Sequence, residues 1–244
     1  MRKRALLVPL LVLFALTASA QKSVEYKAFA DSADGFSNLY RGSAPLAYRF
    51  LHTGTFFAYG VEFLPGEVMF NDKLYTDVML NLNSHLDELY LFVKETGRYV
   101  VLNKDFVDYF SLAQRKFYHF RESKTSEADT LSPGFYELLY GNESARLFKK
   151  TRKVYAERIN HFASSVTNSK LERMFMPIYS YYLIKEKETH NVKRFRDILS
   201  IYNIRRKELR PLIREKSLDV TKDKENSFTE IIKFIETSGI SGKK

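Results

Sequence analysis

The segment Leu64–Leu112 decides the fold, and it reads LPGEVMFNDKLYTDVMLNLNSHLDELYLFVKETGRYVVLNKDFVDYFSL. Turn pairs such as Pro65-Gly66, Asn71-Asp72 and Thr96-Gly97 separate its short apolar runs. Within residues 77–82 apolar side chains recur at every second position, which is the period of a half-buried strand. Strands this close in the chain can only pair antiparallel, because a parallel crossover needs about a dozen or more residues. We therefore predict an antiparallel β-meander.

The β-type pattern continues on both sides of this segment. A run of mixed basic and aromatic residues at 116–121 predicts a strand, and a turn at 141–142 predicts a hairpin of 135–140 with 145–150. Residues 152–177 give no clear prediction. Further strands are expected upstream of the meander and near its end: Leu39–Gly42, Ala47–Leu51, Gly54–Phe63 with a bulge at Gly60, and Tyr179–Lys185.

After residue 192 the apolar spacing becomes helical. Phe195, Ile198, Leu199 and Tyr202 follow the i, i+3, i+4, i+7 pattern, and 228–235 repeats it before the terminating Gly239. Between these two helices, Asn203 is expected to be the N-cap of a third, which presents Leu209, Leu212 and Ile213. Pro211 falls inside that third helix, which is therefore expected to be kinked or to begin later.

These patterns together predict an α+β fold, with an antiparallel β-meander sheet followed by a C-terminal helical segment. We expect three parts: a signal peptide at 1–20, a β-meander domain at 21–191 and a helical segment at 192–244 packed on it. The 45% content of hydrophobic residues is enough for a sizeable core and excludes a disordered chain.

The first 20 residues have the three regions of a secretory signal. A basic start at 2–4 precedes an apolar run at 5–16 and small residues at 18–20. An apolar run of this length is shorter than the roughly 20 residues that span a bilayer, so no transmembrane segment is expected after cleavage. The sequence has no cysteine, which excludes a lipoprotein anchor and disulfides. We expect an exported, soluble protein that is periplasmic or associated with the outer membrane.

The charge is unevenly distributed along the chain. Residues 21–141 carry a net charge of −4, whereas residues 142–244 carry +11. A basic half often indicates nucleic acid. Export makes that partner improbable, so we expect no nucleic acid, and an envelope protein or an anionic envelope polymer is the expected partner. A solvated basic surface without a partner is the alternative.

The sequence carries no recognisable catalytic or cofactor motif. No two of its ten glycines lie two, four or five positions apart, which excludes the common dinucleotide, phosphate and nucleophile-elbow motifs. The five histidines lack metal-ligand spacing. We therefore assign no catalytic, cofactor-binding or metal residue. The carboxylate pairs Asp87/Glu88 and Asp105/Asp108 are the residues that a hydrolase would use.

Several blocks of the chain resemble a family of uncharacterised exported proteins from Bacteroidota. In some relatives this region is appended to a short secretin/TonB-type domain, which this chain is too short to include, and the resemblance implies no established activity. The blocks that carry it are Leu39–Gly42, Phe63–Val68, Asn71–Tyr75, Asp77-Val78, Asp87–Leu89, Val100–Leu102, Pro133–Tyr140, Tyr181–Lys185 and Lys207–Arg210.

Three functions stay open from the sequence. The preferred one is a non-enzymatic binding or structural module for a protein or envelope polymer. The alternatives are a periplasmic carrier of lipid or lipoprotein of the half-barrel type, and a glycan or peptide hydrolase.

Two sets of residues are candidates for binding and modification. Arg206, Arg210 and Arg214 lie four residues apart, so a continuous helix would align their guanidinium groups as a strip for phosphate or carboxylate groups. Ser32 and Thr130 lie in Asp-Ser-Ala and Asp-Thr-Leu triplets that resemble the O-glycosylation motif of some exported Bacteroidota proteins.

Overall fold

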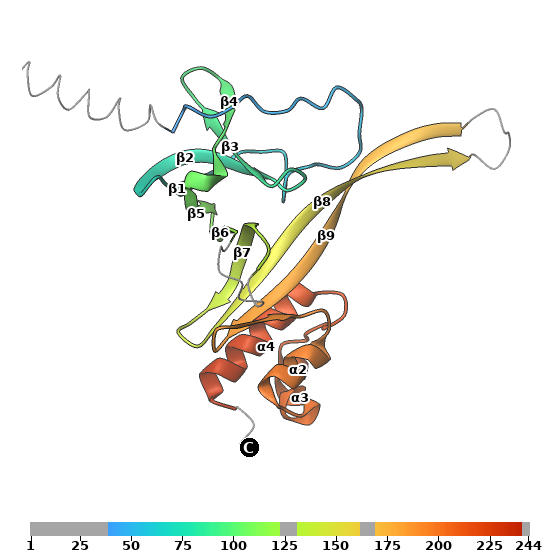
Figure 1. The fold of residues 1–244 in the computed structure, drawn as a ribbon. Helices are drawn as coiled ribbons and strands as arrows, with labels where there is room; N and C mark the ends of the chain where they lie inside the picture. Colours follow the sequence, from blue (N-terminus) through green and yellow to red (C-terminus); the bar gives the residue numbers. More distant parts are fainter. Residues whose placement is uncertain (1–38, 123–130, 162–168, 241–244) are drawn as a thin grey trace, which may run out of the picture. The chain divides into compact units, whose positions relative to one another are not determined.

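The structure is a computed structural model that describes residues 39–122, 131–161 and 169–240. At residues 160, 161, 169 and 170 it describes the backbone alone. Contacts divide the chain into two compact units, Met1–Gly42 and Ser43–Lys244. The signal segment 1–20, Ser32 and Thr130 lie outside the described residues. All described strands and helices belong to the second unit (Figure 1).

The second unit consists of a sheet followed by helices, and this order confirms the predicted α+β class. None of the described helices has both the length and the apolar composition needed to cross a bilayer. The strands are β1 (Leu64–Phe70), β2 (Lys73–Asn83), β3 (Glu88–Val93), β4 (Arg98–Val101), β5 (Val107–Leu112), β6 (Arg115–Phe120), β7 (Gly134–Gly141), β8 (Ala145–His161), β9 (Ser169–Lys185) and β10 (Glu188–Asn191). A short 3-10 helix, η1 (Lys104–Phe106), precedes β5, and the α-helices are α2 (Phe195–Tyr202), α3 (Arg206–Glu215) and α4 (Lys224–Ser238).

The ten strands form one open antiparallel sheet in the order β10-β9-β8-β7-β6-β5-β1-β2-β3-β4. The sheet departs from a simple meander at one point, because β5 returns from the β4 edge to pair with β1. Asn71 and Asp72 make the β1–β2 turn with φ values of 51° and 60°, the left-handed region that a two-residue type I′ turn requires. The hairpin predicted at 135–150 is confirmed by the β7–β8 pairing.

Three predicted strands are wrong: Leu39–Gly42, Ala47–Leu51 and Gly54–Phe63. The last segment makes one isolated bridge, between Phe57 and Asn83, and no ladder. Two further backbone bonds, from Ala58 N–H to Leu82 O and from Ser84 N–H to Phe56 O, and the side chain of Asn81 hold its backbone. Asn81 Nδ2 donates to the carbonyl oxygens of Gly60 and Glu62, each at 2.9 Å, so Gly60 is not a bulge in a strand. The aromatic residues that suggested strands pack their rings over the sheet, as the edge-to-face contact of Phe57 with Tyr90 shows.

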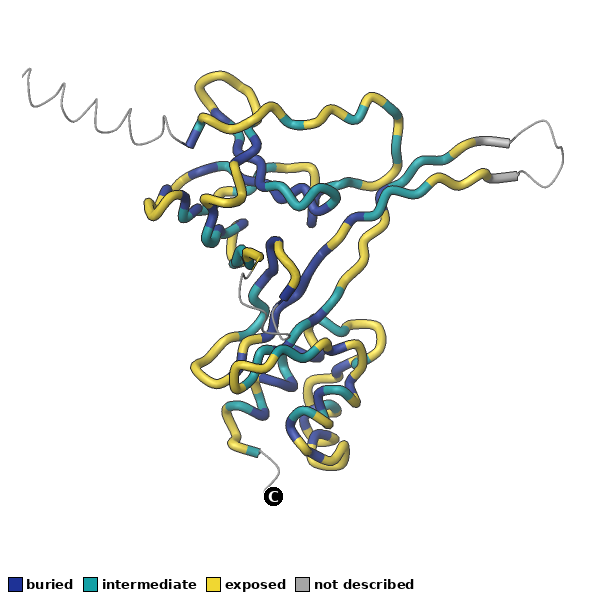
Figure 2. The backbone as a smooth tube through the Cα atoms, viewed as in Figure 1, coloured by how far each residue is buried: buried dark blue, intermediate teal, exposed yellow. Residues whose placement is uncertain are grey.

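The region without a clear sequence prediction contains the longest strands. β8 and β9 each have 17 residues and pair along their whole length. β7 accompanies β8 only as far as Lys149, and β10 accompanies β9 only as far as Tyr182. Beyond these points the two strands continue as a two-stranded arm (Figure 1), whose residues are mostly exposed or half-buried (Figure 2). The arm showed no period of two because neither of its faces is uniformly buried.

The three helices pack on the other part of β8 and β9. They share one core cluster with these strands, whose fully buried members include Leu147, Leu183, Ile198, Leu209, Phe228, Ile231 and Ile232. Asn203 is not an N-cap: its φ of 52° makes it the left-handed C-cap of α2, and Arg205 is the N-cap of α3. α3 therefore begins two residues later than a helix capped by Asn203 would, and it continues through Pro211.

Candidate functional site

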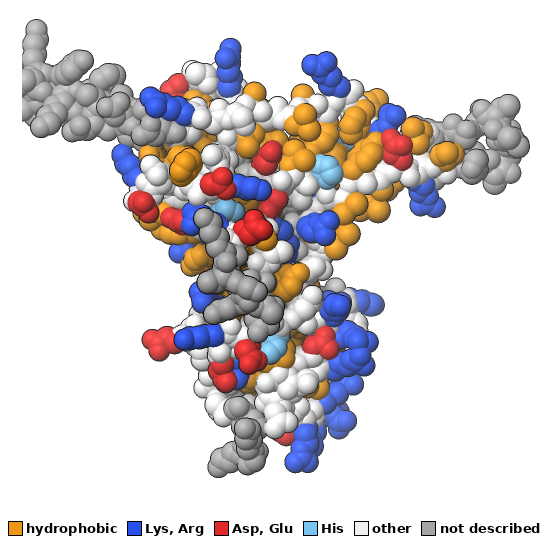
Figure 3. All heavy atoms as spheres, in the orientation of Figure 1, with side chains coloured by type: hydrophobic (Ala, Val, Ile, Leu, Met, Phe, Trp, Pro, Cys, Tyr) orange, Lys and Arg blue, Asp and Glu red, His pale blue; other side chains and the backbone are white. Residues whose placement is uncertain are grey.

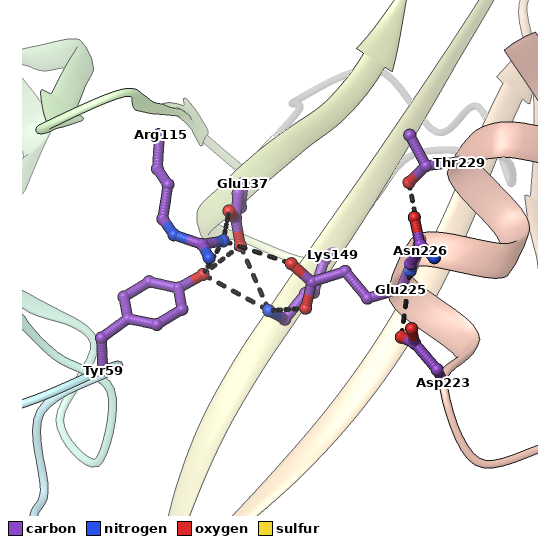
Figure 4. Close-up of polar contacts among 8 residues, drawn as sticks. All are labelled: Tyr59, Arg115, Glu137, Lys149, Asp223, Glu225, Asn226 and Thr229. Carbon is purple, nitrogen blue, oxygen red and sulfur yellow. Dashed lines mark hydrogen bonds and ion pairs between the residues drawn. The ribbon is translucent and has the colours of Figure 1, made fainter.

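A cluster of charged side chains lies between the sheet and α4. It consists of Tyr59, Arg115, Glu137, Lys149 and Glu225 (Figure 4), and we call it the charge cluster. Glu137 and Lys149 are almost completely buried, with side chains 3% and 2% exposed. Buried charges are rare in proteins unless they are paired, so this cluster is the first place to look for a function.

Five different segments contribute to the charge cluster. Arg115 begins β6, Glu137 is in the middle of β7, and Lys149 faces Glu137 directly across the β7–β8 ladder. Tyr59 comes from the irregular segment before β1, and Glu225 is in the first turn of α4. The cluster thus ties that segment and α4 to three adjacent strands.

Each charge in the cluster has a partner of opposite sign. Arg115 donates to Glu137 Oε1 at 2.6 Å, and its distance to Glu225 Oε1 is 3.2 Å. Lys149 Nζ lies 2.6 Å from Glu225 Oε2 and 3.3 Å from Glu137 Oε2. The two cations and two carboxylates therefore balance.

The Tyr59 hydroxyl completes the network. It donates to Glu137 and accepts from Arg115 and Lys149, each at 3.3 Å, while the Arg115 guanidinium stacks over the Tyr59 ring at 4.3 Å. Burial and the Glu137 carboxylate raise the pKa of Tyr59 far above its ordinary value, so the phenol stays protonated. Burial alone would raise the pKa of Glu225, but hydrogen bonds from Lys149 and Arg115 outweigh it and lower that pKa.

A cavity of about 430 Å³ adjoins the charge cluster, and Arg115, Glu137, Asp223, Glu225 and Asn226 are among its lining residues. The polar atoms at its wall are engaged with one another: Asp223 caps α4 by accepting from Asn226 N, and Thr229 donates to Glu225 O. Acid catalysis at neutral pH needs a carboxyl group with a raised pKa, whereas the pKa of Glu225 is lowered. The arrangement fits a structural role, in which the ion pairs of Glu225 hold α4 against the sheet.

Two of the four carboxylates considered for a hydrolase, Asp87 and Asp108, are engaged in ion pairs. Asp87 accepts from Lys150 Nζ at 2.8 Å and from the backbone N–H of Phe135, and burial lowers the pKa of that lysine. Asp108 pairs with Arg121 at 2.6 Å. The structure thus places Asp87 and Asp108 in separate ion pairs.

An apolar cavity of about 360 Å³ lies between the segment before β1 and strands β3 and β4. Its wall is mainly aromatic, and it includes Tyr48, His52, Phe56, Phe63 and Tyr99. The rings of Phe63 and Tyr99 stack at 4.8 Å with an interplanar angle of 13°. A cavity of this size and lining is typical of sites for small apolar ligands.

The predicted arginine strip is exposed on α3. Because the helix continues through Pro211, Arg206, Arg210 and Arg214 keep their four-residue spacing, while Leu209 and Leu212 face the core. Among the described residues, no carboxylate forms an ion pair with any of the three arginines. The strip is therefore available to an external anion.

Sequence reasoning did not identify the charge cluster. One signal was present: Glu137 is a lone carboxylate within the apolar run GFYELLYG of β7. A charge inside such a run implies a buried partner, yet nothing in the sequence pairs it with Lys149, Arg115 or Glu225, which are up to 110 residues apart.

No family model, curated protein or solved structure matches the chain. The resemblance to exported Bacteroidota proteins accordingly stays a prediction.

Proposed function

We propose that this protein is a non-enzymatic binding module for an anionic partner, a protein or polymer of the cell envelope with closely spaced phosphate or carboxylate groups. The observation that carries the proposal is the basic surface of α2 and α3. Residues 193–216 contain nine Lys and Arg side chains against three Asp and Glu, and all nine are exposed. Figure 3 shows basic side chains gathered over this region.

Few of these charges are neutralised within the protein. Arg196 lies 3.9 Å from Asp197, and Lys216 pairs with Glu230. The arginine strip has no such partner among the described residues. In contrast to the charge cluster, whose cations are paired with carboxylates of the protein, the strip keeps its guanidinium groups available for bidentate contacts with phosphate or carboxylate.

The repulsion within the strip supports the same conclusion. Like charges four residues apart on a helix destabilise it by a few tenths of a kcal/mol per pair. The four-residue spacing of the strip therefore does not stabilise the helix. Arg214 lies in the last turn, where a cation is favourable, and Arg206 lies over the Phe195 ring, but all three side chains are exposed.

Binding to soluble polyanions tests the proposal. The parent protein and the variant Arg206→Gln/Arg210→Gln/Arg214→Gln are titrated with polyphosphate and with polyglutamate at increasing salt. Each cation near an anionic surface contributes about 1 kcal/mol, so the variant is expected to bind about tenfold or more weakly, with a smaller salt dependence. The two polymers distinguish phosphate from carboxylate recognition.

The matched control is Lys94→Gln/Arg98→Gln/Lys104→Gln, which removes the same charge from exposed positions around β4. It should bind as the parent does. Equal losses in both variants would mean that only net charge matters, and failure of the parent to bind either polymer at low salt would refute the proposal.

The aromatic cavity favours a second candidate, a carrier of lipid or lipoprotein acyl chains. Its lining includes no Lys, Arg, Asp or Glu, which suits an uncharged chain. Native mass spectrometry of the protein incubated with a long-chain fatty acid tests this idea: a bound adduct that Phe56→Ala reduces would support it, and the lack of any adduct would exclude it.

A further inference from the structure

The backbone hydrogen bonds at the base of the arm reveal which groups point outward. Thr53 N–H donates to Arg173 O at 2.8 Å, and Phe175 N–H donates to Thr53 O at 3.1 Å. On the other strand, Lys153 N–H donates to Ser84 O at 3.0 Å. Backbone groups in an antiparallel pair alternate between the partner strand and the outside. The odd-numbered residues of both strands therefore direct their N–H and C=O groups away from the hairpin.

At the base of the arm, the outer edge of β9 is partly occupied. Thr53 pairs with the C=O of Arg173 and the N–H of Phe175, and Tyr181 O accepts from Val192 N–H. Between them, Pro177 occupies an outward position and has no N–H to offer. Proline at such a position is a known protection of an exposed edge against added strands.

The outer edge of β8 has no such protection. Beyond Lys153 the outward positions are Tyr155, Glu157 and Ile159. No backbone group of the described residues pairs with them from the outside. A free edge of this length is a ready template for one more strand.

The side chains along this edge specify the partner. On one face of the arm, Arg152 and Arg158 are exposed and flank Val154 and Ala156, which are half-buried. Met176, across the ladder from Val154, is 45% exposed and extends the apolar surface. A strand that fits this face has an acidic residue at each end and apolar residues between them, at alternate positions.

A second copy of the chain is a poor fit for the same edge. Two copies paired antiparallel about Tyr155 would place Arg152 of one opposite Arg158 of the other. Like charges directly opposite each other destabilise a strand pair.

We propose that the edge of β8 from Arg152 to Ile159 binds an extended, acidic peptide segment of a partner protein by β-strand addition. This inference goes beyond the proposed function, since it concerns a different surface and rests on backbone geometry rather than on the arginine strip. Main-chain hydrogen bonds supply the affinity, and the two arginines select the acidic ends.

The probe is the peptide acetyl-Glu-Thr-Val-Thr-Val-Thr-Glu-amide, followed by amide exchange in NMR. In the free protein the amides of Tyr155, Glu157 and Ile159 should exchange rapidly, because they have no partner. The peptide should slow all three, and a peptide with Lys in place of Glu should bind severalfold more weakly. A peptide that leaves the three amides unprotected at millimolar concentration overturns the proposal.

Two variants separate the backbone contribution from the side chain. Glu157→Pro removes one outward N–H without breaking a β8–β9 ladder bond, as Pro177 does in β9, and it should abolish peptide binding. Glu157→Ala removes the same carboxylate but keeps the N–H, and it should bind as the parent does. Continued protection of the even-numbered amides Val154 and Ala156 verifies that the hairpin of Glu157→Pro is intact.

Two further results would contradict binding of an acidic peptide at the β8 edge. Unchanged binding by a folded Glu157→Pro variant would refute strand addition. Protection of the three amides that rises with protein concentration alone, together with dimers in sedimentation equilibrium, would assign the edge to a second copy instead.

Discussion

The inner and outer parts of the β8–β9 hairpin share two strands and one continuous register but differ in what covers them. In the inner part, from Ala145 to Lys150, β7 and β10 extend the sheet and α4 packs against it, so that even Lys149 is buried. In the outer part the aromatic segment before β1 covers only the face that carries Tyr155 and Phe175. Within the described part of the chain, no segment covers the opposite face or pairs with the β8 edge.

This difference indicates where the protein gains its stability and where it can bind. In the inner part Lys149 and Lys150 pair with carboxylates, and neighbouring strands cover both edges of the hairpin, so the inner part has less left to offer a ligand. The outer part keeps exposed apolar side chains and unpaired backbone groups, which are the features that partner binding requires.

The largest expected effect is in the inner core. Phe148 is 1% exposed, and Phe148→Ala should destabilise the protein by about 3–5 kcal/mol, because it leaves a cavity. Met176→Ala, in the outer part, should cost less than about 1 kcal/mol, since Met176 is 45% exposed and less of its side chain is buried. Urea denaturation of both variants measures the difference, and similar losses would contradict the division of the hairpin.

The ion pairs of the inner part should likewise contribute more to stability than those of the outer part. Lys149→Met leaves Glu137 buried with one cation fewer, and we expect a loss of about 3 kcal/mol, the lower end for a broken buried pair because Arg115 remains. Arg173→Met breaks the exposed pair with Glu157 in the outer part and should leave the Tm unchanged. A large drop for Arg173→Met would show that the outer pair is also structural.

The boundary between the two parts can be tested at Gly134. Its φ is 135°, and an added Cβ would collide with the Asp87 carboxylate and the Lys150 ammonium group, which form an ion pair there. Gly134→Ala should therefore cost about 1–3 kcal/mol. Gly97→Ala is the control, since Gly97 also has a positive φ but open space around it, and a loss as large as that of Gly134→Ala would assign the effect to φ alone.

The smallest effect concerns pH. The folded-state pKa of Glu225 is lowered, so its ionised form stabilises the charge cluster at every pH above the unfolded-state pKa of about 4.3. This contribution should disappear as the pH falls from about 4.3 through the lower folded-state pKa. Thermal unfolding of Glu225→Gln should show a weaker dependence on pH in that window than the parent, and identical pH profiles would exclude a role for Glu225.

The sequence by itself determined the α+β class, the turns at Asn71-Asp72 and Thr96-Gly97, the β7–β8 hairpin and the helical faces of α2, α3 and α4. The turn predicted at Pro65-Gly66 is wrong, because both residues lie within β1 and pair with β2. The correctly predicted features are local, because turn chemistry and apolar periodicity act over a few residues. The alignment of Arg206, Arg210 and Arg214 followed in the same way, once the helix was known to continue through Pro211.

Only the tertiary structure decided the rest. The place of β1 between β5 and β2, the irregular course of residues 54–63 and the length of β8 and β9 depend on contacts between distant segments. The charge cluster is the clearest case, since Lys149 is recognisable as a buried cation only when Glu137 and Glu225 lie within 3.3 Å of it. Whether a polar group is buried, and whether an edge is open, depends on what the folded chain brings next to it, and local periodicity carries no record of that.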